Sequence, residues 1–125
     1  MEEGYIELNN LFVYKLSLEL CNLGWQVYGG LDWQQKKIIG DQFIRAVDSV
    51  AANIAEGYGR FHYLDKNKFY YNARGSLLET KHWNHLLHTR KIITQDQSDK
   101  FLKLANQVHY NINQLIKSQY NSKNQ

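Results

Sequence analysis

Apolar side chains recur along this chain every three or four residues, which is the spacing of one face of an α-helix. The first such segment covers about residues 8–29 and carries two neighbouring stripes. One stripe consists of Leu11, Tyr14, Leu18, Cys21, Trp25 and Tyr28, and the other of Val13, Leu16, Leu20, Leu23 and Val27. Together they form a wide apolar face, so we expect this helix to contact more than one neighbour.

A second helix is predicted over about residues 33–61, after a glycine pair that ends the first helix and Asp32, which is suited to cap the next. Its predicted core stripe consists of Ile39, Phe43, Val47, Val50 and Ile54. A polar line follows the same helix beside this stripe and consists of Arg45, Ser49, Asn53 and Glu56. Polar groups at this spacing project from one side of the helix.

Two further helices are predicted, over residues 66–91 and 95–119, each opened by a capping residue. Asp65 is the expected cap of the third helix, and Thr94 with Gln97 forms a capping box for the fourth. The third helix has the stripe Phe69, Ala73, Ser76, Thr80, Trp83 and Leu87. The fourth has Phe101, Ala105, Val108, Ile112 and Leu115 facing inward, and residues 120–125 form a polar tail.

The whole pattern favours an all-α fold. The chain contains no alternating apolar and polar runs of the kind that strands require, and its 125 residues include no proline. The predicted connections are short, as between antiparallel neighbours. We therefore expect one domain over residues 1–125, folded as an antiparallel up-down-up-down four-helix bundle with long, unbroken helices.

Composition adds limits on location and chemistry. The single cysteine cannot form an internal disulfide, no apolar run is long enough to span a membrane, and Glu2 and Glu3 differ from the basic start of a signal peptide. These features predict a cytoplasmic protein.

The positive charge is concentrated on the third predicted helix. The net charge is +3, and residues 65–91 hold six Lys or Arg against two acids. On a helical wheel drawn at 100° per residue, four cations lie within a sector of about 100°, together with polar and aromatic residues. These cations are Lys66, Arg74, Lys81 and Lys91. The predicted nucleic-acid or partner site consists of Lys66, Tyr70, Arg74, Lys81, His88 and Lys91. Cations hold phosphates and an interleaved aromatic stacks a base, although a solvated outer face has the same composition.

Catalytic and metal-binding patterns are weak. Glu79 and His82 have the spacing of a di-iron helix pair, but no second copy exists, and His82, His85 and His88 are splayed around the helix. Cys21 lies on an apolar face, where a thiol is inert. We expect no metal, no cofactor and no enzymatic activity.

Two blocks of sequence carry a family resemblance. Residues 52–60, ANIAEGYGR, are followed at helical distance by Ala73, Arg74, Gly75, Ser76 and Glu79. This pattern resembles the four-helix-bundle proteins encoded in intervening sequences of 23S rRNA genes, which are related to the accessory variability determinants of diversity-generating retroelements. The matching positions are Gln42, Arg45, Ala46, Ser49, Asn53, Glu56, Gly57, Gly59, Arg60, Gly75, Ser76 and Glu79. The chain differs from the family pattern at two positions. Ala51 stands where many members have proline, and Arg74 stands where a small or apolar residue is frequent.

The resemblance implies a homopentamer with a basic surface or central channel and no enzymatic activity. It also implies that the protein binds RNA or DNA and a reverse transcriptase. A protein-only scaffold is the alternative, and a HEPN-like ribonuclease is disfavoured because Arg74 and His82 lie eight positions apart, farther than such enzymes place them. For the matched residues we expect a structural or interface role. Asn53, Glu56 and Arg45 would form hydrogen bonds, and Gly57 and Gly75 would allow close helix contacts.

Overall fold

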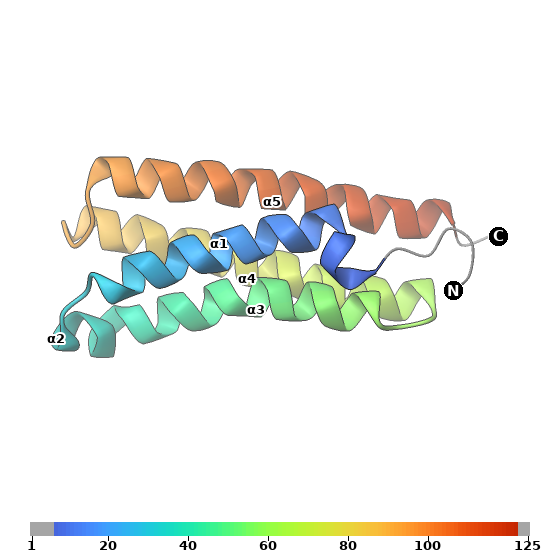
Figure 1. The fold of residues 1–125 in the computed structure, drawn as a ribbon, viewed down its shortest axis with the longest axis horizontal. Helices are drawn as coiled ribbons and strands as arrows, with labels where there is room; N and C mark the ends of the chain where they lie inside the picture. Colours follow the sequence, from blue (N-terminus) through green and yellow to red (C-terminus); the bar gives the residue numbers. More distant parts are fainter. Residues whose placement is uncertain (1–6, 123–125) are drawn as a thin grey trace.

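The computed structural model describes residues 7–122, and its regular structure is entirely helical (Figure 1). The long helices are α1 (Phe12–Gly29), α3 (Asp41–Tyr58), α4 (Tyr63–Thr89) and α5 (Gln95–Asn121). A 3-10 turn, η1 (Leu8–Asn10), precedes α1, while α2 (Trp33–Gln35) and the π-helical η2 (Lys36–Gly40) lead into α3. The described part of the chain contains no strand, so the all-α prediction is confirmed.

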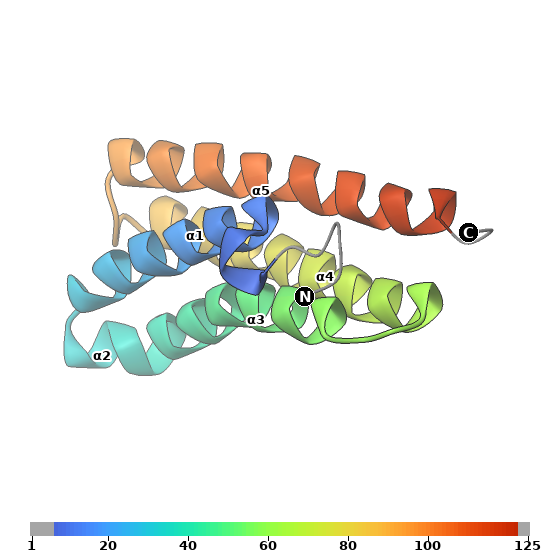
Figure 2. The same ribbon diagram turned by 45° about the vertical axis from the view of Figure 1, so that its right-hand side comes forward.

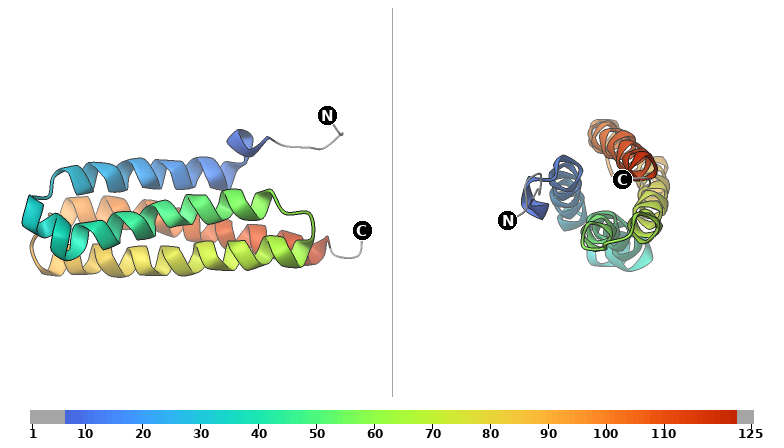
Figure 3. Two further views of the ribbon diagram at one scale, coloured as in Figure 1. Left: turned by 90° about the horizontal axis from the view of Figure 1, so that it is seen from below. Right: turned by 90° about the vertical axis from the view of Figure 1, so that its right-hand side faces the viewer.

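Each long helix packs against two others. α3 contacts α1 and α4, and α5 contacts α1 and α4. Figure 1 shows the turns after α1 and α4 at one end of the molecule and the turn after α3 at the other, and Figure 2 shows α3 and α5 on either side of α4. Seen along the helices in Figure 3, the four surround a common interior. As predicted, α1 contacts two neighbours.

The interior is formed where the sequence predicted it on α3 and α5. The five residues of the predicted stripe, which begins with Ile39 in η2 and continues in α3, are at most 1% exposed. Phe101, Ala105, Val108 and Ile112 of α5 are fully buried. The rings of Phe43 and Phe101 meet with centroids 5.3 Å apart. Full burial of each large side chain stabilises the fold by about 1.5–3 kcal/mol, so this contact anchors the centre of the bundle.

The two stripes on α1 differ in burial, although partly buried residues of the second stripe also pack against the core. Val13, Leu16, Leu20 and Val27 are buried. The other stripe is partly open to solvent, with Trp25 63% and Leu18 39% exposed. The wide apolar face of α1 is therefore wider than the single chain covers.

The core face of α4 differs from its prediction. The buried residues are Asn67, Tyr70, Ala73, Leu77, Thr80, Asn84 and Leu87. Phe69, Ser76 and Trp83, which the sequence placed in the core, are only half-buried. Ala73, Thr80 and Leu87 are buried as predicted, and the other three predicted positions each lie one residue before a true core residue. The polar core residues Asn67 and Asn84 hide this part of the face from hydropathy. Asn67 donates to the backbone carbonyl of Ile116, and Asn84 donates to Ser98.

Two predictions about where helices begin and end differ from the structure. α4 begins at Tyr63, where His62 Nδ1 accepts from the backbone N–H of Leu64, so Asp65 lies in the first turn instead of capping it. The expected unbroken helix over residues 33–61 is interrupted by the π-turn η2 and ends at Tyr58.

The capping boxes of Asp32 with Gln35 and of Thr94 with Gln97 form, the second as predicted. Of the polar tail, only residues 120–122 are described, and α5 extends into them as far as Asn121. None of the described helices has the length and apolar character needed to cross a membrane.

Candidate functional site

Two of the predicted cations meet residues of α5 along the line where α4 and α5 pack. Arg74 Nη1 donates to Asn113 Oδ1 at 2.9 Å, and Lys81 Nζ lies 2.8 Å from His109 Nδ1. We call these four residues the basic seam. Partial burial, followed by the charges of Lys81 and Arg74, lowers the pKa of His109 below its ordinary value. The neutral ring then accepts the Lys81 hydrogen bond, and the positive charge of the seam is carried by Arg74 and Lys81, although burial also lowers the pKa of Lys81.

Aromatic side chains continue the seam toward the start of α4. The hydroxyls of Tyr71 and Tyr120 lie 3.3 Å apart, and the Tyr63 ring meets Tyr120 edge-on at 6.3 Å. The Arg74 guanidinium covers the Tyr71 ring at 4.8 Å from its centroid. We call Tyr63, Tyr71 and Tyr120 the tyrosine cluster. Tyr71 and Tyr120 remain 39% and 40% exposed, so their rings are both held in place and open to a ligand.

The aromatic residue that the sequence assigned to this surface lies elsewhere. Tyr70 is 1% exposed and packs against Gly57 of α3, where burial raises the pKa of its hydroxyl. Its prediction as a base-stacking residue is wrong. The helical wheel placed it near the cations, but at this position α4 is covered by α3.

Lys66, His88 and Lys91 are not part of the seam. Lys66 turns to the end of α3, where its Nζ donates to the Tyr58 carbonyl at 2.9 Å and lies 5.3 Å from the Tyr58 ring centroid. His88 is half-buried in the last turn of α4, and Lys91 lies beyond that helix in the turn to α5. The residues of the predicted basic sector therefore lie in separate places. A helical wheel shows neither where a helix ends nor which helices pack against it.

The residues that sequence reasoning missed are His109, Asn113, Tyr71 and Tyr120. Three of them lie on α5. Their nearness to the cations depends on how α5 aligns with α4, and the pattern of a single helix does not show that alignment. One signal was present in the sequence. Residues 100–121 contain three lysines and a histidine and no acid. Such a stretch marks α5 as a second basic element.

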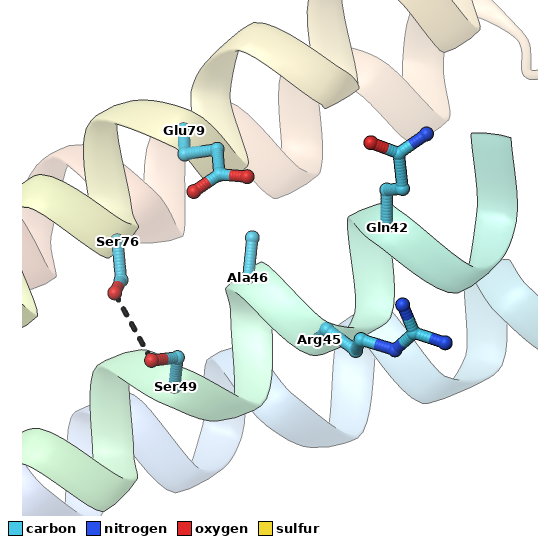
Figure 4. A pocket seen from close by; sticks show the side chains of 6 residues that line it. All are labelled: Gln42, Arg45, Ala46, Ser49, Ser76 and Glu79. Atoms are coloured by element: carbon cyan, nitrogen blue, oxygen red, sulfur yellow. Dashed lines mark hydrogen bonds between the residues drawn. The ribbon is translucent and has the colours of Figure 1, made fainter.

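A second feature is a polar groove of about 310 Å³ between α3 and α4. It is lined by Gln42, Arg45, Ala46, Ser49, Ser76 and Glu79, all of them positions of the family pattern (Figure 4). Ser76 Oγ donates to Ser49 Oγ at 3.1 Å, and Asn53 Nδ2 donates to the Ser49 carbonyl at 2.9 Å. Figure 4 shows the Arg45 guanidinium extending away from Glu79. Asn53 therefore hydrogen-bonds within its own helix, and Ser76 bonds across to α3.

The remaining pattern residues cluster near the end of α3. Glu56 and Arg60 form an exposed ion pair at 2.6 Å, and the Arg60 guanidinium lies 4.7 Å from the Phe69 ring centroid. Gly59 is the C-cap residue that follows α3. Gly57 makes the predicted close helix contact, but a methyl group on Gly75 would find nothing within 4 Å, so the prediction for Gly75 is wrong.

The described residues offer little for metal or thiol chemistry. Within residues 7–122 no three His, Cys, Asp or Glu side chains are grouped to hold a metal ion. Burial, with a smaller contribution from Asp48, raises the pKa of Cys21 to about 12. Its thiol is therefore protonated near neutral pH and a poor nucleophile.

Comparison with known proteins settles the family. The family model of the 23S rRNA-intervening sequence proteins matches residues 9–114. The chain belongs to this family. A crystal structure of a protein with unknown function, from the S23 ribosomal protein family of Bacteroides thetaiotaomicron, superimposes with a TM-score of 0.80. That protein is 24% identical, and the match covers 84% of this chain and 98% of the other, which shows a shared fold. No curated protein matches the chain.

Proposed function

We propose that this protein is a non-enzymatic, cytoplasmic, oligomeric adaptor that binds RNA or DNA through the basic seam. The supporting observation is that Arg74 and Lys81 lie with His109 where two helices meet, beside a stretch of α5 that has no acid. Glu79, the acid nearest to them on α4, lines the groove on the α3 side. Cations without nearby carboxylates attract phosphates and gain further from counterion release.

The oligomeric part of the proposal is an antiparallel up-down-up-down bundle assembled as a homopentamer. The family membership and the open apolar stripe of α1 support it, since Leu18 and Trp25 of that stripe are 39% and 63% exposed. Apolar surface of this kind is typical of protein interfaces. Light scattering after size exclusion should give five times the 14.8 kDa chain mass. A monomer at micromolar concentration would contradict the pentamer without affecting the seam.

Binding is tested by fluorescence anisotropy with labelled RNA and DNA oligonucleotides over a salt series. The affinity should fall steeply with salt, and the double variant Arg74→Glu with Lys81→Glu should lower the slope of log K against log salt by about 2. The matched control reverses Lys15 and Lys37, which are exposed on α1 and η2 and change the net charge equally. Circular dichroism verifies that both variants fold.

Two outcomes would reject the nucleic-acid function: no binding at low salt, or equal binding by the seam variant and its control. The protein-only scaffold for a reverse transcriptase or another partner would then be the better reading, and the open stripe of α1 would be its contact surface. The non-enzymatic part is tested separately. Cleavage of a mixed RNA pool that is lost in His82→Ala would overturn it.

A further inference from the structure

The basic seam and the tyrosine cluster form one continuous surface along α4 and α5. Tyr71, Arg74, Leu78 and Lys81 follow one another at a spacing of three and four residues, which places them on the same side of α4. On α5 their partners run in the opposite order, with Tyr120 beside Tyr71, Asn113 beside Arg74 and His109 beside Lys81. This alignment puts rings at one end and cations along the rest.

We propose that this surface binds single-stranded nucleic acid, with bases stacking on Tyr71 and Tyr120 and the backbone phosphates held by Arg74 and Lys81. The inference rests on the proposed function and adds its ligand class. Aromatic rings accept any base face, but only when the base is free of its duplex neighbours. A surface that offered cations alone would bind both forms through their phosphates.

The rings are already held in a binding arrangement. The Arg74 guanidinium lies on the Tyr71 ring at 4.8 Å, and Tyr120 is fixed by its hydroxyl contact with Tyr71 and by the edge of Tyr63. Fixing these side chains in advance reduces the entropy lost on binding. Leu78, 53% exposed, lies between the two cations and adds an apolar contact for a sugar or base.

The length of the surface fits a short strand. Ten residues of helix separate Tyr71 from Lys81, a rise of about 15 Å. At the ~3.4 Å phosphate spacing of a stacked strand this corresponds to about four nucleotides. Binding modules of other folds that hold single strands occupy a similar length, about 4–16 nucleotides.

The test compares a labelled 20-nucleotide single-stranded RNA with the same sequence annealed into a duplex. The double variant Tyr71→Leu with Tyr120→Leu should weaken single-strand binding by at least about fivefold for each base that stacks, and leave duplex binding within twofold. Tyr110→Leu is the control, because Tyr110 is a tyrosine of α5, like Tyr120, is 64% exposed and lies outside the tyrosine cluster. Tyr71→Phe keeps the ring and should retain single-strand binding.

Each outcome separates this inference from the proposed function. Equal loss for both RNA forms, or no loss, in the double variant overturns the single-strand assignment, while the salt-dependent loss in the seam variant still supports nucleic-acid binding. No binding of either form at low salt rejects both. A second measurement uses the unaltered protein. Photocrosslinking to 4-thiouridine RNA should label the peptides that contain Tyr71 or Tyr120, and labelling confined to α1 or α3 would overturn the inference.

Discussion

Gly57 of α3 lies so close to the ring of Tyr70 on α4 that no side chain fits between them. A methyl group at Gly57 would stand 2.6 Å from Tyr70 Cε1 and 2.9 Å from the backbone carbonyl oxygen of Lys66. This contact sets the separation of the two helices near their shared turn. It also explains why Tyr70 is buried, since the absent side chain leaves the space that its ring occupies.

Gly57→Ala should therefore destabilise the protein. The new methyl group must displace both a buried ring and a backbone carbonyl, and overpacking of this kind costs about 1–3 kcal/mol, more than the gain in helix propensity. Urea unfolding followed by circular dichroism measures the change in the free energy of unfolding. Gly75→Ala is the matched control, because its surroundings are open, and it should stabilise α4 by about 1 kcal/mol. Equal effects of the two substitutions would contradict the packing argument.

The same two helices show what the sequence could and could not predict. The core of α3 follows an uninterrupted apolar stripe, so periodicity identified it residue by residue. On α4 the core includes Asn67, Thr80 and Asn84, which donate hydrogen bonds to oxygen atoms of α5 or of their own helix. Because those partners are known only after the helices are paired, hydropathy placed half of the α4 stripe one residue before the true core positions. The helical wheel of the cations likewise placed the buried Tyr70 at the surface.

The sequence likewise predicted part of the candidate site: the cations on α4, but not their partners on α5. Arg74 and Lys81 were identified because charge on one helix can be read from spacing. His109 and Asn113 lie about thirty to forty residues later and meet these cations through the alignment of α4 with α5. The family pattern likewise identified the residues of the polar groove, but not that six of them line one surface.

The hydroxyl pair of Ser49 and Ser76 should stabilise the contact of α3 with α4. Their Oγ atoms are 3.1 Å apart in a half-buried position, and a neutral hydrogen bond of this kind contributes about 0.5–1.5 kcal/mol. A double-mutant cycle of Ser49→Ala and Ser76→Ala, measured by urea unfolding, should give a coupling energy in this range. The pair of Ser76→Ala with Ser118→Ala, two residues on different helices without a mutual hydrogen bond, is the control. Additive effects in the first cycle would show that the hydroxyls act independently.

Lys91 adopts a backbone conformation that suits glycine. It lies at φ 61°, and the bonds from Ile92 N–H to the Leu87 carbonyl and from Lys91 N–H to the His88 carbonyl form the capping turn that ends α4. Lys91→Gly should stabilise the protein by about 0.5–1 kcal/mol, because the left-handed region is strained for side chains other than glycine. Thermal unfolding measures the effect. Arg90→Gly, at φ −83°, is the control and should lower the melting temperature, so a similar rise in both would refute the explanation.

His109 should make the stability of the protein depend on pH. Burial, and after it the charges of Lys81 and Arg74 from α4, lowers its pKa in the folded state, while the unfolded chain keeps a value of about 6.5. The unfolded state therefore binds more protons in the range below about pH 6.5, and the free energy of unfolding decreases as the pH falls through it. Below the lowered pKa this contribution is fully lost. His109→Gln should remove this part of the pH dependence.

The cause of the shift is tested by titrating the His109 ring protons by NMR. Lys81→Met removes the nearer cation and should raise the pKa of His109 toward its ordinary value, whereas Lys15→Met on α1 should leave it unchanged. Saturating single-stranded RNA should also raise the pKa, because phosphates on the seam offset the repulsion between the ring and the two cations. The RNA should then bind more tightly as the pH falls below 6.5. A pKa that does not respond to Lys81→Met would show that the charge of Lys81 does not contribute to the shift.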